Sequence, residues 1–247
     1  MTQLVHTQVV HGLATFTLDS PHNRNALSAQ LVAELGAALD QAAADPDVRA
    51  VLLRSSGRVF CSGADLSEAA EGDMRRGAEE LVGLLRRILA LPVPVVAEIA
   101  GPVRAGGIGI VAACDIAVAV ESATFAFTEV KLALAPAVIS LTVLPRLTSR
   151  AAARTFLTAE QFDGRAAAVM GLITEAVSPD ALHGVVAQTC DALVSSPVQG
   201  LRETKRLLNR DLLARLDDRG AELAALSAEL FGSEPARQAM RAFLSRS

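Results

Sequence analysis

Tryptophan and tyrosine are both missing from this 247-residue sequence, and phenylalanine occurs only 8 times. Surfaces that bind single-stranded nucleic acid commonly stack the bases on aromatic side chains. Basic clusters, which neutralise the phosphates, are lacking as well, and the formal net charge is −4. We therefore expect no nucleic-acid partner.

Cysteine is also scarce, and long apolar runs are absent. Cys61, Cys114 and Cys190 are isolated from one another and odd in number, which is typical of a protein from a reducing cytoplasm. The histidines show no metal-ligand spacing, so we expect no metal. No apolar run reaches the roughly 18 residues of a membrane span. The first residues lack the basic and long apolar regions of a secretory signal, so we expect a cytoplasmic protein.

Hydrophobic residues are plentiful, at 51%, and their pattern alternates between strand and helix. Residues 8–18 alternate like one half-buried strand, whereas three short apolar runs are typical of buried parallel strands. Helices are expected between them, the first of which is capped by Ser28 and buries Leu31, Leu35 and Leu39. The pattern predicts an α/β fold with a parallel sheet. The three apolar runs are 50–54, 93–99 and 116–120, and the later helices are 78–91 and 106–113.

Only helical patterns follow residue 179 or so, with apolar residues at i, i+3 and i+4 spacing. We place a boundary near Asp191, between an α/β core over residues 1–190 and a C-terminal helical region over residues 191–247. A tail of short amphipathic helices usually packs on another surface. The predicted helices are 181–194, 198–216, 221–231 and 235–243.

Two stretches break from apolar strand patterns into small residues: VFCSGADL at 59–66 and AGPVRAGGIG at 100–109. Small residues let a ligand approach the backbone closely. Two backbone N–H groups that converge there would form an oxyanion hole, which stabilises negative charge on a carbonyl oxygen. The glycines lack the spacing of dinucleotide or nucleoside-triphosphate loops. In this order and at this distance, the two motifs resemble the crotonase superfamily, which comprises enoyl-CoA hydratases and isomerases.

The resemblance covers nearly the whole chain and implies a crotonase fold of repeated ββα units with a C-terminal helical trimerisation region. It further implies an acyl-CoA thioester as substrate, no cofactor, and a homotrimer or a dimer of trimers. The oxyanion donors would be the N–H groups of Ala64 and Gly106, the latter in the first turn of a helix. By the same resemblance, CoA-binding residues are Arg24, Asn25, Ala26, Leu27, Ala64, Asp65, Leu66, Phe243 and Arg246.

Phe243 and Arg246 resemble a terminal Phe-x-x-Lys that reaches the neighbouring subunit's CoA site in this family, with a frayed terminus as the alternative. Arg24 would lie near the phosphates of CoA, although a solvated loop charge is the alternative. Asp65 we interpret as a helix cap or orienting group. Cys61 we interpret as buried filler, because no basic partner activates its thiol.

The catalytic carboxylate implied by the resemblance is Glu129. Burial among Phe125, Phe127 and Val130 would raise its pKa, as an acid–base group at neutral pH requires. A surface carboxylate paired with Lys131 is the alternative.

Two-glutamate hydratases carry another Glu three residues after the oxyanion glycine, where this sequence has Gly109. The APAVIS segment at 135–140 resembles a single-glutamate branch that includes methylglutaconyl-CoA hydratase-like proteins. We expect Gly109→Glu to restore the two-glutamate arrangement if the pocket has room.

Several activities stay open at this point. The resemblance favours hydration of an enoyl-CoA, and one carboxylate can equally isomerise its double bond. A catalytically silent CoA-thioester binder and a thioester hydrolase are further alternatives. Glu68 and Glu71, in the segment after Leu66, are carboxylates that could replace Glu129 in the chemistry.

Overall fold

The computed structural model describes residues 2–71 and 74–245. Its main sheet has six strands in the order β1-β2-β3-β4-β6-β9, all parallel to their neighbours except the antiparallel pair β1–β2. A second sheet has the order β5-β7-β8. The main strands are β1 (Val5–Val10), β2 (Leu13–Leu18), β3 (Ala50–Ser55), β4 (Val95–Ile99), β6 (Ile116–Val120) and β9 (Glu175–Val177).

The single strand predicted over residues 8–18 is wrong, because β1 and β2 form a hairpin there. His11 and Gly12 lie at the turn with φ of 49° and 85°, the pair of positive angles that suits a tight two-residue hairpin. The register pairs Val10 with Leu13 across this turn. Alternation of apolar residues on both sides of the turn resembles one long strand in sequence.

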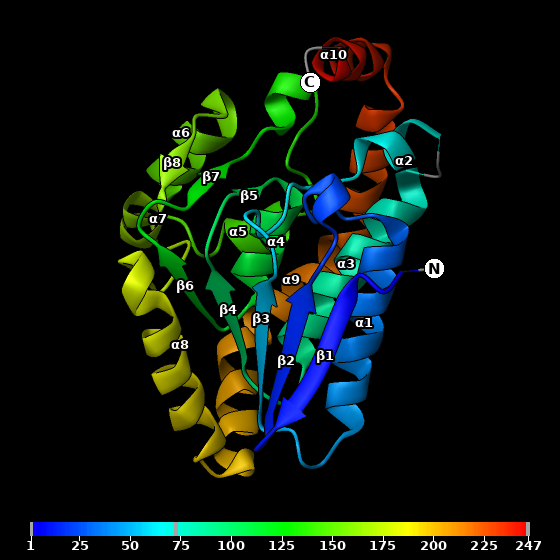
Figure 1. The fold of residues 1–247 in the computed structure, drawn as a ribbon. Coiled ribbons are helices and arrows are strands. Elements are labelled where there is room, and N and C mark those ends of the chain that lie inside the picture. Colours follow the sequence, from blue (N-terminus) through cyan, green and yellow to red (C-terminus); the bar gives the residue numbers. More distant parts are fainter. Residues whose placement is uncertain (1, 72–73, 246–247) are drawn as a thin grey trace.

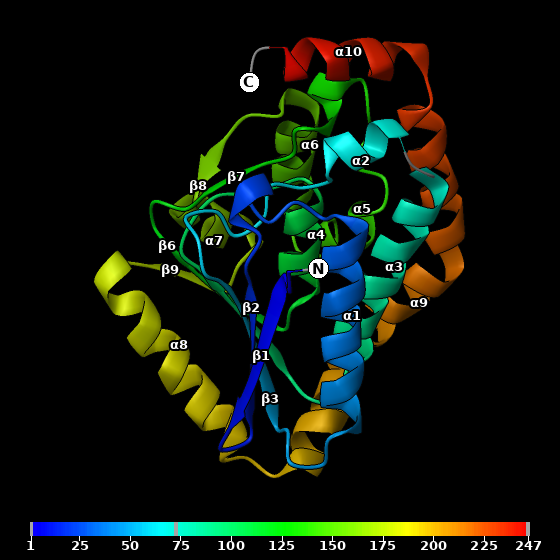
Figure 2. The same cartoon turned by 45° about the vertical axis from the view of Figure 1, so that its right-hand side comes forward.

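Helices cover both faces of the main sheet (Figure 2). α1 (Ala29–Ala44) and α3 (Met74–Ala90) lie on one side, and α8 (Pro179–Val194) lies on the other. The Oγ atom of Ser28 accepts a hydrogen bond from the N–H of Leu31 at 3.3 Å, which confirms the predicted cap. Leu31, Leu35 and Leu39 are buried as expected.

The C-terminal region contains one helix where we predicted two. α9 (Val198–Phe231) runs for 34 residues without a break, and α10 (Glu234–Leu244) follows it. Gly220, which lies between the two predicted helices, is inside α9 and lets it approach α3, since a Cβ there would lie 2.8 Å from Cγ1 of Val82. The boundary predicted at Asp191 lies inside α8, which continues to Val194.

α9 is tied to the α/β part by a buried ion pair. The Nζ atom of Lys205 lies 2.8 Å from the carboxylate of Asp115 and donates to the carbonyl oxygens of Ile88 and Val93. Both side chains are almost fully buried, where breaking such a pair is strongly destabilising. Leu212 and other residues of α9 belong to the main hydrophobic core.

The fold is therefore a mixed α/β architecture with a mainly parallel sheet and a C-terminal helical region. Within the described residues, no helix is long and apolar enough to cross a membrane. The remaining elements are η1 (Pro21–Asn23), α2 (Leu66–Glu71), β5 (Val103–Arg104), α4 (Gly106–Ala113), β7 (Thr124–Ala126), η2 (Glu129–Leu132), α5 (Ser140–Val143), α6 (Ser149–Thr158), β8 (Phe162–Asp163) and α7 (Gly164–Met170).

Candidate active site

A cavity of about 1250 Å³ lies where the parallel strands end. Much of its wall comes from the segments that follow β2, β3, β5 and β7, and α2, α3 and α10 complete it. Figure 1 shows α10 lying across this end of the molecule, close to α2. Ligand sites in α/β sheets commonly lie at the carboxyl ends of the strands, and this cavity is large enough for a substantial ligand.

Most of the predicted site residues lie on the wall of this one cavity. Phe243, expected at a neighbouring subunit, lines the cavity of its own chain. Arg246 lies outside the described residues. The roles of these residues in binding stay predictions. Those that line the cavity are Arg24, Ala26, Leu27, Ala64, Asp65, Leu66, Gly106, Glu129 and Phe243.

Asn25 is buried behind the loop and is not on the cavity wall. Its Nδ2 donates to the carbonyl oxygen of Val59 at 2.9 Å, and its Oδ1 accepts from the N–H of Ser20 at 2.7 Å. Asn25 therefore joins the 21–27 loop to the segment that carries Ala64.

The two predicted oxyanion segments lie side by side. The N–H of Arg104 donates to the carbonyl oxygen of Cys61 at 2.9 Å, in a parallel bridge. A Cβ on Gly107 would lie 2.7 Å from the Cβ of Cys61, so only glycine permits this approach. Leu27 extends the arrangement on the other side, because its N–H donates to the carbonyl oxygen of Gly63 at 2.8 Å.

The N–H groups of Ala64 and Gly106 remain available to a ligand. Among the described residues, no acceptor takes the N–H of Ala64. Gly106 is the first residue of α4, so its N–H has no acceptor within the helix and lies at its positive end. Ala105, directly before it, has φ 45° and ψ −119°, a strained conformation for alanine and one typical of functional sites.

Leu27 has a contact that the sequence did not reveal. A Cβ on Gly106 would lie 2.7 Å from Cδ1 of Leu27. A side chain at position 106 would therefore displace the tip of Leu27, which packs against this turn.

Asp65 caps α2, as predicted. Its Oδ1 accepts from the N–H of Ser67 at 3.0 Å, and its Oδ2 accepts from Nδ2 of Asn23 at 3.0 Å. Partial burial acts to raise the pKa of Asp65, but the hydrogen bonds outweigh it and hold the pKa below its usual value. An ionised carboxylate held in this way orients the backbone beside Ala64.

Glu129 opens η2 and faces the cavity. Burial raises its pKa to about 7, against a weaker opposing hydrogen bond from its own backbone. Its Oε2 atom is buried and has no hydrogen-bond partner among the described residues. The alternative of a surface pair with Lys131 finds no support, because no ion pair joins these residues in the described part of the chain. Glu129 can therefore exchange a proton near neutral pH.

The phenylalanines that flank Glu129 in sequence are buried and pack on other aromatic rings. The ring of Phe127 contacts Phe156, with centroids 4.4 Å apart, and that of Phe125 stacks on Phe162 at 5.7 Å. Val130 is 41% exposed. The segment after Glu129, which the sequence suggests as a part of the pocket that shapes specificity, supplies apolar residues to the cavity wall: Leu132, Leu134, Ala135, Pro136, Ala137, Val138 and Ile139.

The other candidate side chains are less suited to acid–base or nucleophilic chemistry. Cys61 is fully buried, and burial raises the pKa of its thiol to about 12, which confirms buried filler. Glu68 lines the cavity, but its Oε2 already accepts from the N–H of Ala29 at 2.8 Å. The side chain of Glu71 lies outside the described part. No group of metal ligands occurs among the described residues.

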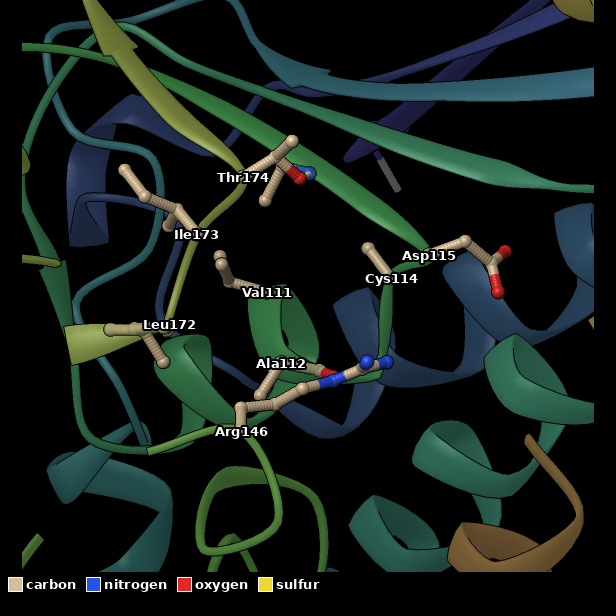
Figure 3. A pocket seen from close by; sticks show the side chains of 10 residues that line it. Val111, Ala112, Cys114, Asp115, Arg146, Leu172, Ile173 and Thr174 are labelled. Atoms are coloured by element: carbon tan, nitrogen blue, oxygen red, sulfur yellow. Dashed lines mark hydrogen bonds between the residues drawn. The ribbon is translucent and has the colours of Figure 1, made fainter. Parts of the chain in front are cut away.

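A second cavity, of about 130 Å³, lies beside Cys114 (Figure 3). It is too small for an acyl-CoA. The Nε atom of Arg146, in its wall, donates to the carbonyl oxygen of Ala112 at 3.1 Å. Asp115 is engaged by Lys205, and burial raises the pKa of the Cys114 thiol to about 12. The polar groups of this cavity serve the fold, so the larger cavity is the candidate site.

Comparison with known proteins identifies the family of this chain. The family model "Enoyl-CoA hydratase/isomerase" matches residues 8–247. The crystal structure of an enoyl-CoA hydratase from Mycobacterium avium is 45% identical, with a TM-score of 0.92 over 100% of this chain and 98% of that one. This chain belongs to the enoyl-CoA hydratase/isomerase family and has the crotonase fold.

Curated relatives in this family include both hydratases and isomerases. A short-chain-enoyl-CoA hydratase from Clostridium acetobutylicum is 28% identical over 95% of this chain and 92% of its own length. A 1,2-epoxyphenylacetyl-CoA isomerase from Escherichia coli is 30% identical over 85% of this chain and 83% of its own length. Family membership thus allows both activities.

Proposed function

We propose that this protein hydrates an enoyl-CoA thioester, with Glu129 as its acid–base group and the N–H groups of Ala64 and Gly106 as its oxyanion hole. One observation carries the proposal. A buried carboxyl with a pKa of about 7 lies on the same cavity wall as two backbone N–H groups whose local structure leaves them available. No cofactor is needed, because the CoA thioester is the substrate.

The reaction balances with one carboxylate. Glu129 removes a proton from water as the oxygen bonds to C3, and the C2–C3 π electrons move onto the thioester oxygen. The N–H groups of Ala64 and Gly106 stabilise this enolate. The enolate then collapses while Glu129 returns its proton to C2. The site residues Arg24, Asp65, Leu66 and Phe243, which share the cavity wall, are proposed to hold the CoA.

Double-bond isomerisation is the second candidate, and Gly109 favours it. With no carboxylate at that position, Glu129 alone can remove a proton from C2 of a 3-enoyl thioester and return it to C4. The same oxyanion hole stabilises the dienolate, and no water is consumed. The relatives named above include examples of both chemistries.

The test is a panel of acyl-CoA thioesters incubated with the purified protein and followed by mass spectrometry. Hydration adds the mass of water, isomerisation leaves the mass unchanged, and hydrolysis releases free CoA thiol. We expect the water adduct from at least one short enoyl-CoA. Binding without any product indicates a silent CoA-thioester binder, and thiol release indicates a hydrolase. Either result would contradict the proposal.

The pH profile should follow Glu129. Its carboxylate must be ionised to accept a proton from water, and burial raises the pKa of Glu129 to about 7. We expect kcat/KM for hydration to rise about tenfold per pH unit below that pKa and to level off above it. Initial rates between pH 5 and 9 measure this. A profile that is flat from pH 5 to 8 would assign the proton transfer to another group.

We also propose a homotrimer or a dimer of trimers. Several large apolar side chains are exposed on the single chain, and burying them against further copies would remove them from water. The exposed residues include Leu157, Val169, Leu207 and Leu208. Light scattering of the full chain should give three or six copies, whereas a stable monomer would contradict the proposal.

We also propose a cytoplasmic location, which is supported by the three buried, free cysteines.

A further inference from the structure

Gly109 lies in the middle of α4, directly against the residue that precedes α5. A Cβ atom at position 109 would lie 2.6 Å from Cγ2 and 3.0 Å from Cβ of Ile139. Figures 1 and 2 show α4 and α5 side by side inside the molecule. Ile139 lines the large cavity, and Gly109 is not among the described residues on its wall. The side chain of Ile139 thus occupies the space into which a side chain at position 109, and with it a second carboxylate, would extend.

Ile139 is firmly held in this place. The Oγ1 atom of Thr142 donates to the carbonyl oxygen of Gly109 at 3.0 Å, so α5 is fastened to α4 at this glycine. The N–H of Val143 donates to the carbonyl oxygen of Ile139 at 2.9 Å. Ile139 is 3% exposed and Thr142 is fully buried. A larger residue at 109 meets both a β-branched side chain with few rotamers and a fixed backbone.

We infer that Ile139 is a specificity-determining residue, which keeps the site to one carboxylate and favours proton transfer over water addition. This inference rests on the proposed function and deepens it: the site hydrates an enoyl-CoA, but less readily relative to isomerisation than it would without the side chain of Ile139. The expectation that Gly109→Glu alone restores a two-glutamate site is contradicted by the geometry, because the space is filled.

The chemical reason lies in the two protons of the attacking water. One proton goes to Glu129 in hydration, and the other O–H stays on the oxygen that bonds to C3. In the proposed arrangement this O–H lies on the Gly109 side, where Ile139 offers hydrocarbon instead of an acceptor, and a buried donor without a partner is costly. Isomerisation moves a proton from C2 to C4 through Glu129 and needs no water. Ile139 therefore penalises hydration selectively.

The experiment uses the full chain with Ile139→Ala, Gly109→Glu and the double variant. Val143→Ala is the matched control, because it shortens a fully buried β-branched side chain of α5 that is not on the cavity wall. The first readout is the thermal unfolding midpoint. The second is the ratio of hydrated to isomerised product in oxygen-18 water, which does not depend on overall turnover.

We expect Gly109→Glu to lower the midpoint by about 5 °C or more in the wild-type and Val143→Ala backgrounds, and by less than half of this beside Ile139→Ala. Ile139→Ala should raise the product ratio about tenfold, since a second water can then accept the free O–H. Val143→Ala should leave the ratio unchanged.

Equal destabilisation by Gly109→Glu in all backgrounds would overturn the inference, and so would equal product ratios for Ile139→Ala and Val143→Ala. If the wild type converts no thioester of the panel, the proposed function fails by itself. The unfolding midpoints then decide alone whether Ile139 occupies the place of a second carboxylate.

Discussion

Glu129→Gln should reduce turnover by about 10⁴-fold or more. The amide keeps the shape of the side chain but cannot accept and return a proton. General acid–base groups contribute about 10²–10⁴-fold, and a single group that acts in both proton transfers lies at the upper end. Steady-state rates on a substrate identified by the thioester panel measure the loss, and acyl-CoA binding should be largely retained.

The fold of this variant can be checked through its stability. Because burial raises the pKa of Glu129 to about 7 from 4.5, the folded state holds a proton that the unfolded chain has lost between these pH values. This proton-linked stability is complete below pH 4.5 and is lost as pH rises through about 7, amounting to about 3 kcal/mol. Glu129→Gln should therefore be at least as stable as the wild type at pH 8.

Glu68→Gln is the matched control for activity. Glu68 lines the same cavity, but its carboxylate caps the start of α1 through the N–H of Ala29. It should keep most of the wild-type rate. If Glu129→Gln retains more than about a tenth of wild-type turnover, far more than acid–base catalysis allows, Glu129 is not the catalytic residue. Glu68 and Glu71 then become the candidates.

The hydrophobic pattern of the sequence predicted α4 and β6, near the site, more accurately than the β1–β2 hairpin and α9. The ranges 106–113 and 116–120 match α4 and β6, because both are short apolar segments bounded by small or polar residues. The hairpin at His11 was missed because its turn interrupts the alternation only briefly. The break predicted before Ala221 was wrong, since the role of Gly220 depends on Val82, a residue far away in sequence.

The same distinction holds within the site. Family motifs singled out Ala64, Gly106 and Glu129, and all three line one cavity. They could not reveal that Leu27 packs on Gly106, or that Ile139 stands over Gly109. Such contacts join residues from separate loops and are set by how the helices meet. The sequence shows that position 109 carries no carboxylate. Only the folded structure shows that Ile139 occupies the space beside it.

Ala64→Pro should lower kcat by about 10²–10³-fold, because proline removes the N–H that we assign to the oxyanion hole. In the free protein this N–H has no acceptor among the described residues, so its removal breaks no internal hydrogen bond there. The effect should therefore fall on the reaction more than on the fold. Rates at saturating substrate, together with the Kd of a non-reactive acyl-CoA, separate the two.

Ala64→Gly is the control, because it retains the donor and should keep most of the activity. Proline also restricts Gly63, whose φ is +92°, so the unfolding midpoint of Ala64→Pro must be compared with that of the glycine variant. A folded proline variant that binds acyl-CoA normally and turns over near the wild-type rate would remove Ala64 from the mechanism. The enolate would then depend on Gly106 alone, at the positive end of α4. A slow proline variant beside an active glycine variant would instead show that the donor, and not the methyl group, is what position 64 supplies.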